Sequence, residues 1–307
     1  MFYTNYIIGE YQLYKKIYLK INDVEYVKVN YKKKLENTKC IIWLPGRNDY
    51  FFHYHFTNLY PDYDIFALSM RNNHNRRKDV YNHIDDLKEH FLEIDTVYEY
   101  FNINSYEEVI LYGHSTGGLI SILYNKFNKK NKISKMILNS PFLKFKRHWI
   151  ENLFLNWIGW FIFDFVPNIN ISFDIFKPNY YAINLSKRFK LNSMYKTFYN
   201  APVISSWLIN IMKHQYKITN NKIKINVPTL IFYCDKSYEK HSDHGDSVLN
   251  IDENLKQVPK LFNNNSLLSL HLIEDSMHDV LCAEGDVDNR NSPLGEVCFK
   301  IDKYLTR

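Results

Sequence analysis

The sequence predicts an α/β protein whose core is a mostly parallel β-sheet with helices on both faces. Short apolar runs within residues 40–44, 64–69 and 135–139 are typical of central strands covered on both sides. Helix-like segments lie between such strands, and this alternation favours a doubly wound arrangement. The chain has 307 residues, of which 46% are hydrophobic, which is enough for one such domain with an insertion.

The chain opens with a predicted β-hairpin. Residues 13–21 and 24–31 alternate or run apolar on either side of Asn22 and Asp23, a pair that favours a turn. The predicted strands at residues 40–44 and 64–69 come next. Residues 79–101 then have apolar side chains at three- and four-residue spacing with charges between them, which predicts an amphipathic helix.

The alternation of strands and helices breaks in the middle of the chain. Residues 108–112 predict a strand and residues 119–127 the helix after it, before the strand at 135–139. Residues 142–217, in contrast, are helix-like and aromatic, with several prolines and no clear strand. We interpret this segment as a helical cap inserted into the sheet.

The alternation resumes after the aromatic segment. Strands are expected at residues 227–234 and 269–273, and a closing helix at 297–305. The expected domain organisation is a core of residues 1–141 and 216–307 and a cap, or lid, of residues 142–215.

The most informative motif is Gly113-His114-Ser115-Thr116-Gly117, which lies between a predicted strand and a predicted helix. Gly-x-Ser-x-Gly in this setting is the nucleophile elbow of the α/β-hydrolases. The serine of an elbow occupies a strained turn, so the flanking positions need glycine to keep Cβ atoms away from the adjoining strand and helix. The motif predicts Ser115 as a nucleophile at the carboxyl edge of the sheet, facing the free N–H groups of a helix N-terminus.

A serine nucleophile needs a histidine base, and in this fold the histidine comes last in chain order. The histidines after Ser115 are His148, His214, His241, His244, His271 and His278. His278 is the best placed, because a short loop joins it to the strand at 269–273 and thus puts it at the carboxyl edge of the sheet. His271 lies within that strand and is expected to be a packed or edge residue.

The carboxylate that would orient the base is less clearly marked. Asp235 ends the strand at 227–234, whereas Asp243 and Asp246 lie deeper in the following loop and Asp252 starts the next predicted helix. For Asp252 a helix-capping role is preferred. Spacing alone does not choose among the others.

The elbow, the strand-loop-histidine ending and the inserted cap resemble the lysophospholipase, monoacylglycerol lipase and serine aminopeptidase-like group of α/β-hydrolases. The segment 46–53, Gly-Arg-Asn-Asp-Tyr-Phe-Phe-His, is similar to a His-Gly-aromatic-Asn-Asp-Tyr-Phe-Phe signature in a bacterial branch of that group. Residues 246–250 and 277–280 also resemble motifs of this branch. The resemblance covers about residues 10–306.

The resemblance implies Asp246 as the acid, because Asp246-x-Val248-x-Asn250 matches the pattern around the catalytic aspartate of the lipases. It also implies that the backbone N–H groups of Arg47 and Thr116 stabilise the oxyanion. The family's histidine before the loop glycine is Pro45 here, which keeps the turn but removes a polar group.

The function expected from these residues is hydrolysis of carboxylic esters, with lipid-like acyl esters such as monoacylglycerol or lysophospholipid favoured. Aromatic side chains of the cap would line the acyl pocket or contact a lipid surface. The pocket candidates are Trp149, Phe154, Trp157 and Trp160. A serine aminopeptidase or thioesterase with the same triad, and a hydrolase-fold binding protein that has lost catalysis, are the alternatives. An aminopeptidase would need acidic cap residues, for which Glu151, Asp164 and Asp174 are available.

Composition narrows the possible partners and location. The formal charge of +6 is modest for this length, and no dense basic face is evident, so nucleic-acid binding is not expected. The four cysteines are dispersed and lack zinc-ligand spacing, so we expect neither a metal nor another cofactor. No signal peptide or membrane span is evident, which favours a cytoplasmic protein acting on a small-molecule or lipid ester, with peripheral membrane contact through the cap as one possibility.

Overall fold

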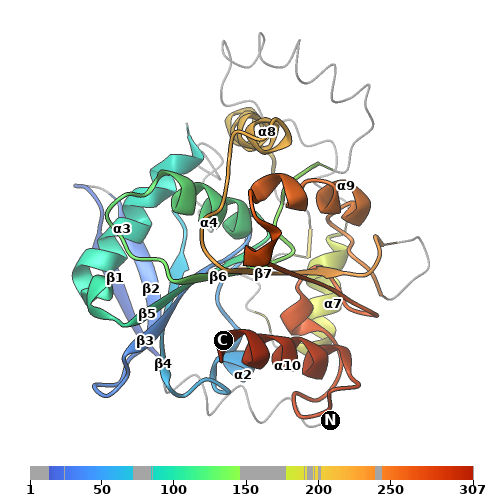
Figure 1. The fold of residues 1–307 in the computed structure, drawn as a ribbon, viewed down its shortest axis with the longest axis horizontal. Helices are drawn as coiled ribbons and strands as arrows, with labels where there is room; N and C mark the ends of the chain where they lie inside the picture. Colours follow the sequence, from blue (N-terminus) through green and yellow to red (C-terminus); the bar gives the residue numbers. More distant parts are fainter. Residues whose placement is uncertain are drawn as a thin grey trace.

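The structure is a computed structural model that describes residues 14–23, 25–71, 84, 86–145, 178–189, 191, 196, 198–199, 202–238 and 244–306. Within these residues the fold is an eight-stranded sheet with helices on both faces (Figure 1). The predicted α/β class, with a mostly parallel sheet, is confirmed.

The order of strands across the sheet is β1-β2-β4-β3-β5-β6-β7-β8. The first two strands pair antiparallel with each other, β2 pairs antiparallel with β4, and all later pairs are parallel. The strands are β1 (Lys15–Lys20), β2 (Tyr26–Lys32), β3 (Lys39–Leu44), β4 (Tyr63–Ser69), β5 (Glu108–His114), β6 (Lys135–Asn139), β7 (Thr229–Cys234) and β8 (Leu268–Ile273). The opening hairpin and every predicted strand are therefore present.

The helices lie on the two faces of the sheet. Those of the described residues are α2 (Tyr54–Thr57), α3 (His90–Phe101), α4 (Thr116–Phe127), α7 (Tyr180–Arg188), α8 (Ser205–Thr219), α9 (Ile251–Leu255) and α10 (Pro293–Leu305). Helices α3 and α4 cover one face, and α2 and α10 cover the other (Figure 1). Short 3-10 turns are η2 (Leu87–Glu89), η3 (Ile103–Ser105), η5 (Val258–Leu261), η6 (Asn265–Leu267) and η7 (Val280–Cys282).

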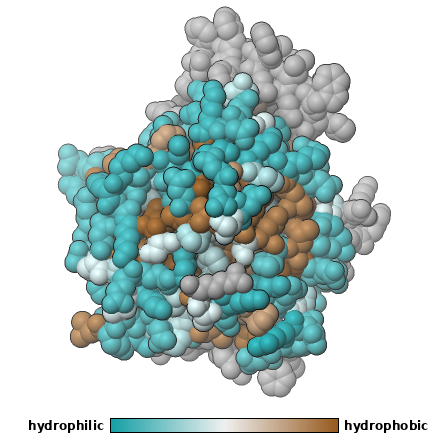
Figure 2. All heavy atoms as spheres, viewed as in Figure 1, coloured by the Kyte–Doolittle hydropathy of each residue, from teal (hydrophilic) through white to brown (hydrophobic). Residues whose placement is uncertain are grey.

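Each central strand supplies side chains to both faces, which explains the short apolar runs of the sequence. In β3, Cys40 and Ile42 belong to the cluster under α3 and α4, whereas Ile41 and Trp43 belong to the cluster under α10. Trp43 stacks on Tyr112 of β5 with a ring-centroid distance of 3.6 Å. Figure 2 shows the surface of the molecule from the same side as Figure 1. Most residues on this side are hydrophilic, and hydrophobic residues are visible in its middle.

Several helix starts differ from the sequence prediction. The helix expected at 79–101 is α3, which begins at His90 after the 3-10 turn η2, and the helix expected at 119–127 is α4, which begins at Thr116. Helix α10 begins at Pro293, because the Ser292 side chain caps it by accepting from the Gly295 N–H. Helix α9 is capped by Asn250, whose side chain accepts from the Glu253 N–H, while Asp252 lies in the first turn. The expected capping role of Asp252 is therefore wrong.

The segment expected as a cap, residues 142–215, is described only in part. It contains α7 and the first part of α8, and α8 continues past residue 215. On α8, Trp207 and Ile211 pack into the core cluster of the sheet. No helix in the described ranges has the length and apolar character needed to cross a membrane.

Candidate active site

Ser115 occupies a strained turn between β5 and α4. Its backbone angles are φ 53° and ψ −116°, a combination that is unfavourable for a residue with a Cβ and that is found preferentially at functional sites. The turn is held by three backbone hydrogen bonds, since the Ser115 N–H donates to the Asn139 carbonyl at 2.9 Å, and the Ser115 carbonyl accepts from Phe142 and Leu119. The side chain is 7% exposed.

The glycines on either side of the elbow leave no room for a larger residue. A Cβ on Gly113 would lie 2.4 Å from the Ser121 hydroxyl, and a Cβ on Gly117 would lie 2.4 Å from the carbonyl oxygens of Leu44 and Pro45. The close approach of α4 to the ends of β3 and β5 therefore requires glycine at both positions.

His278 and Asp246 are brought together by the loops that follow β8 and β7. The Nδ1 atom of His278 lies 2.8 Å from Oδ2 of Asp246, and both side chains are buried. The other carboxylate oxygen of Asp246 accepts from the N–H groups of Val248 and Leu249, each at 2.7 Å. These two donors fix the rotation of the carboxylate, so that Oδ2 faces the imidazole.

Asp235, the rival candidate, has different partners. Its carboxylate accepts from the Cys234 thiol at 3.3 Å and lies 3.9 Å from the Lys236 ammonium, and its side chain is 24% exposed. Among the described residues no hydrogen bond joins it to His278. The hydrogen bond expected for Asp246 is present, whereas Asp235 is turned to other groups.

The imidazole of His278 lies beside the elbow. Its ring centroid is 4.9 Å from that of His114, the residue before Ser115, and 5.3 Å from that of Tyr181 on α7, which meets it edge-on. Within the described chain, no hydrogen bond joins Ser115 to His278. Such bonds are often long in proteins without substrate and shorten in the reacting complex.

The two expected oxyanion donors line one small hollow next to the elbow. Thr116 is the first residue of α4, and its N–H donates to no acceptor in the described part of the chain. The hollow is lined by residues of the β3–α2 loop, of the segment after β4, of the start of α3, of α4 and of α8: Pro45, Gly46, Arg47, Met70, Arg71, Ile84, His90, Thr116, Ile120 and Trp207. The Arg47 guanidinium stacks 4.4 Å from the Trp207 ring and donates to the Pro202 carbonyl.

The proposed pocket aromatics Trp149, Phe154, Trp157 and Trp160 lie outside the described residues. The same holds for Glu151, Asp164 and Asp174, the acidic candidates of the aminopeptidase alternative, and for Asp243.

A buried ion pair connects the elbow to the segment expected as a cap. Asp49, in the loop after β3, lies 2.8 Å from the Lys196 ammonium and 3.2 Å from Nδ1 of His114. Burial alone would raise the pKa of Asp49, but Lys196 and His114 hold it well below its usual value. For His114 the directions are reversed. Burial alone would lower its pKa, but the carboxylates of Asp279 and Asp49 raise it above its usual value. The ammonium also lies 4.2 Å from the ring of Tyr181.

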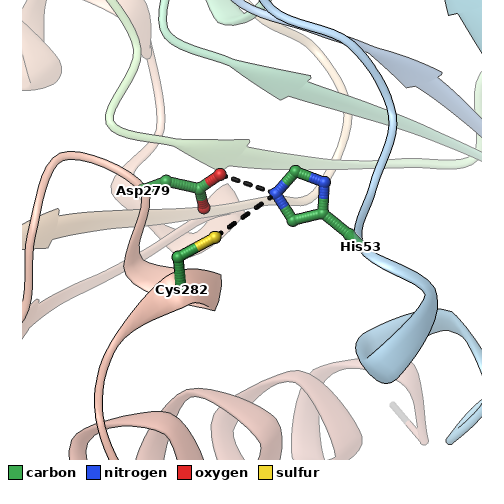
Figure 3. A group of neighbouring side chains, drawn as sticks. All are labelled: His53, Asp279 and Cys282. Carbon is green, nitrogen blue, oxygen red and sulfur yellow. Dashed lines mark hydrogen bonds and ion pairs between the residues drawn. The ribbon is translucent and has the colours of Figure 1, made fainter. Parts of the chain in front are cut away.

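A second buried polar group surrounds the carboxylate of Asp279. Figure 3 shows His53, from the loop before α2, pointing at Asp279 and at Cys282 of η7. The distances from His53 Nε2 are 2.6 Å to Asp279 Oδ2 and 3.7 Å to Cys282 Sγ. Burial would raise the pKa of Asp279, but the neighbouring His53 and His114 and the hydrogen bonds that it accepts hold it below its usual value.

In the part of the chain that the structure describes, two groups of three side chains offer ligand atoms close enough for a metal ion. They are His53, Asp279 and Cys282, and Asp49, His114 and Asp279. In the first group burial raises the pKa of the Cys282 thiol, whereas metal binding needs the thiolate. Nδ1 of His53 has no partner among the described residues, whereas a metal-bound imidazole usually donates this proton. The first group therefore fits a hydrogen-bonded network better than a metal centre.

Sequence reasoning did not assign a role to these buried groups. The block from Asn48 to His53 stood out as a motif, and Asp279 directly follows His278, but neither carries a spacing that indicates its partners. Lys196 had no signal at all, because a single lysine in an aromatic segment is normally solvated.

The sequence profile of the family described as "Serine aminopeptidase, S33" matches residues 69–284, which is more than half of the chain. A search of curated proteins finds no match.

Solved structures of α/β-hydrolases share the fold at low sequence identity. A soluble variant of monoglyceride lipase from Saccharomyces cerevisiae, in complex with a substrate analogue, is 16% identical with a TM-score of 0.66, and the match covers 95% of this chain and 96% of that one. The esterase EaEST from Exiguobacterium antarcticum is 13% identical with a TM-score of 0.57, covering 95% and 100%. Est1E from Butyrivibrio proteoclasticus is 13% identical with a TM-score of 0.56, covering 95% and 97%. Profile and fold agree, and the chain belongs to the serine aminopeptidase S33 family of α/β-hydrolases.

Proposed function

We propose that this hydrolase is a serine esterase in which Ser115 is the nucleophile, His278 the general base and acid, and Asp246 the residue that orients the base. The hydrogen bond between His278 Nδ1 and Asp246 Oδ2, formed beside the strained elbow of Ser115, carries the proposal. A neutral imidazole that donates from Nδ1 keeps Nε2 unprotonated, which is the tautomer that accepts a serine proton.

The reaction then follows from these three side chains. Ser115 Oγ attacks the ester carbonyl while His278 Nε2 takes its proton, and the backbone N–H groups of Arg47 and Thr116 stabilise the oxyanion of the tetrahedral intermediate. His278 returns the proton to the departing alcohol, which leaves an acyl-enzyme. Water, deprotonated by the same imidazole, releases the acid. Asp246 stays ionised and stabilises the imidazolium.

Lipid-like acyl esters are the favoured substrates. The solved structures of similar fold include a monoglyceride lipase and the esterase EaEST, which is consistent with ester chemistry. The hollow beside the elbow also has apolar walls, with Met70, Ile120 and Trp207 among its lining residues. The aromatic residues of the segment 142–215 would extend this surface and provide peripheral contact with a membrane.

An aminopeptidase is the second candidate, because the family carries that description. The described residues favour the ester over it. A site for the substrate ammonium needs a carboxylate, and none is among the described residues that line the hollow beside the elbow. Arg71 does line it, and its guanidinium is already paired with Glu25 and Glu93. A thioesterase would use the same catalytic groups, and a protein without catalysis remains the alternative of a different class.

The test is covalent labelling with a fluorophosphonate together with turnover of p-nitrophenyl esters, aminoacyl p-nitroanilides and acyl-coenzyme A. We expect labelling and ester hydrolysis in the unmodified protein, and neither in Ser115→Ala. Ser121→Ala is the matched control, because its hydroxyl donates only to the Gly117 carbonyl within α4. Labelling of Ser115→Ala at the parent rate would show that another residue is the nucleophile. Faster turnover of the anilides or thioesters than of the esters would reassign the substrate class.

A further inference from the structure

We propose that Asn139 and Asp279 are positioning residues that fix the loop of His278 relative to the elbow of Ser115. The inference rests on the proposed function, because it concerns the distance between the proposed nucleophile and its base. Neither residue is placed in contact with substrate.

Asn139 is the last residue of β6, and it contacts both halves of the site. Its backbone carbonyl accepts from the Ser115 N–H at 2.9 Å. Its side-chain amide donates to Asp279 Oδ1 at 2.6 Å and to the Tyr112 hydroxyl at 2.8 Å, and its side-chain oxygen accepts from the Val280 N–H at 3.2 Å. The residue is fully buried. One side chain therefore joins the strand that carries the elbow to the two residues that follow His278.

Asp279 holds the opposite side of the His278 loop. Besides the Asn139 amide, its carboxylate accepts from the Leu281 N–H at 3.1 Å and faces His53 Nε2 at 2.6 Å. The neighbouring residue His278 turns its own side chain to Asp246. Two consecutive residues thus make two separate histidine–aspartate contacts, and the backbone between them is held from both sides.

The other anchors of this loop lead to β7 and β8 rather than to the elbow. The Ser276 carbonyl accepts from the Gly245 N–H at 3.0 Å and from the Cys234 thiol, and the Ser276 hydroxyl donates to the Ile273 carbonyl. These contacts set the loop against the Asp246 side. The contact between Asn139 and Asp279 sets it against the Ser115 side.

The pattern of donors and acceptors makes asparagine specific at position 139. Its two amide hydrogens meet two acceptors, Asp279 and Tyr112, while its oxygen meets one donor, Val280. Asn139→Asp would keep the shape but place two carboxylates in contact, which can share one proton but cannot both be ionised at that distance. The loop would move away, and a displacement of about 1 Å between reacting groups can cost about 100-fold in rate.

The experiment compares Asn139→Asp, Asp279→Asn and the double variant in ester turnover. We expect Asn139→Asp to lower kcat about 100-fold with little change in KM, and to lose more activity as the pH rises and the shared proton leaves. Asp279→Asn should cost less, because the new amide oxygen can still accept from Asn139 and Leu281. The double variant should recover at least about tenfold over Asn139→Asp, since only one carboxylate is then buried in the pair and the repulsion between two is removed.

Asp64→Asn is the matched control for lost stability. Asp64 is fully buried and accepts from the Lys34 N–H, the Asn37 amide and the Tyr106 hydroxyl, but it lies at the amino end of β4, at the opposite edge of the sheet from the elbow. The kcat of Asp64→Asn should stay within about twofold of that of the unmodified protein, at temperatures at which both proteins are folded.

Each outcome decides between the two proposals. Absence of labelling and turnover in the unmodified protein would overturn the proposed function, and this inference with it. An active parent whose Asn139→Asp variant loses no more kcat than Asp64→Asn, or whose double variant shows no recovery, would overturn the positioning role alone. If Asn139→Asp does not fold, Asn139→Ser removes the contact without adding a charge, and a parent-like kcat in that variant would equally refute the role.

Discussion

Replacing Asp246 by asparagine tests the assignment of the acid, and the structure specifies what the change would do. The carboxylate oxygen Oδ1 accepts from the N–H groups of Val248 and Leu249. In Asp246→Asn the amide oxygen must take this place, because an amide nitrogen there would face two donors. The amide NH2 group would then face Nδ1 of His278.

The expected loss follows from this fixed orientation. An NH2 group facing Nδ1 turns that nitrogen into an acceptor, so the imidazole proton moves to Nε2 and the ring cannot take a proton from Ser115. Loss of the carboxylate also removes the charge that stabilises the imidazolium. In serine triads the combined effect is about 10⁴-fold in kcat, or about 5.5 kcal/mol of transition-state stabilisation.

The assay is steady-state ester turnover with thermal unfolding measured in parallel. Asp246→Asn should fold, since the two backbone hydrogen bonds are retained, while kcat falls about 10⁴-fold. Asp235→Asn is the control, because its carboxylate is partly exposed and contacts Cys234 and Lys236 instead. The assignment of Asp246 as the acid would be refuted if Asp246→Asn keeps more than about a tenth of the parent activity, or if Asp235→Asn lowers kcat more than Asp246→Asn does.

Two further predictions concern the elbow and the pH dependence of stability. Gly117→Ala should prevent soluble expression or abolish probe labelling, because its Cβ would lie 2.4 Å from two backbone carbonyl oxygens; a labelled, folded variant would show that α4 can shift. Burial lowers the pKa of His55 to about 4, helped by the charge of His53, whereas the unfolded value is about 6.5. The unfolded chain therefore binds the proton first, and the free energy of unfolding should fall by up to about 3 kcal/mol as the pH drops from about 6.5 to about 4. Urea unfolding at several pH values measures this, and His55→Gln should flatten that part of the curve; an unchanged slope would mean that other groups cause it.

The sheet and the elbow were predictable because each is encoded locally. Short apolar runs identify strands buried on both faces. The glycines around Ser115 indicate a tight turn in which a residue with a Cβ atom would clash with its neighbours. The position of His278 followed from chain order and from the edge at which parallel strands end.

The buried polar network was not predictable, because its contacts join residues far apart in the sequence. Asn139 and Asp279 are 140 positions apart, and Asp49 and Lys196 have no shared periodicity or motif. Asp246 could be assigned as the acid only through a family resemblance, because the loop after β7 contains several aspartates and their distances in sequence from His278 do not distinguish them. Only the fold shows which of them has two backbone donors to fix its rotation.

The ion pair between Asp49 and Lys196 limits how this hydrolase can evolve. Here the segment 142–215 supplies an ammonium 2.8 Å from a buried core carboxylate, and both side chains are almost fully inaccessible. A transplanted segment without that cation would leave the buried Asp49 carboxylate with His114 but without its ammonium partner, at a cost of up to about 3–5 kcal/mol. We therefore expect a replacement segment to be tolerated only if it keeps a cation at this position or if both charges are lost together.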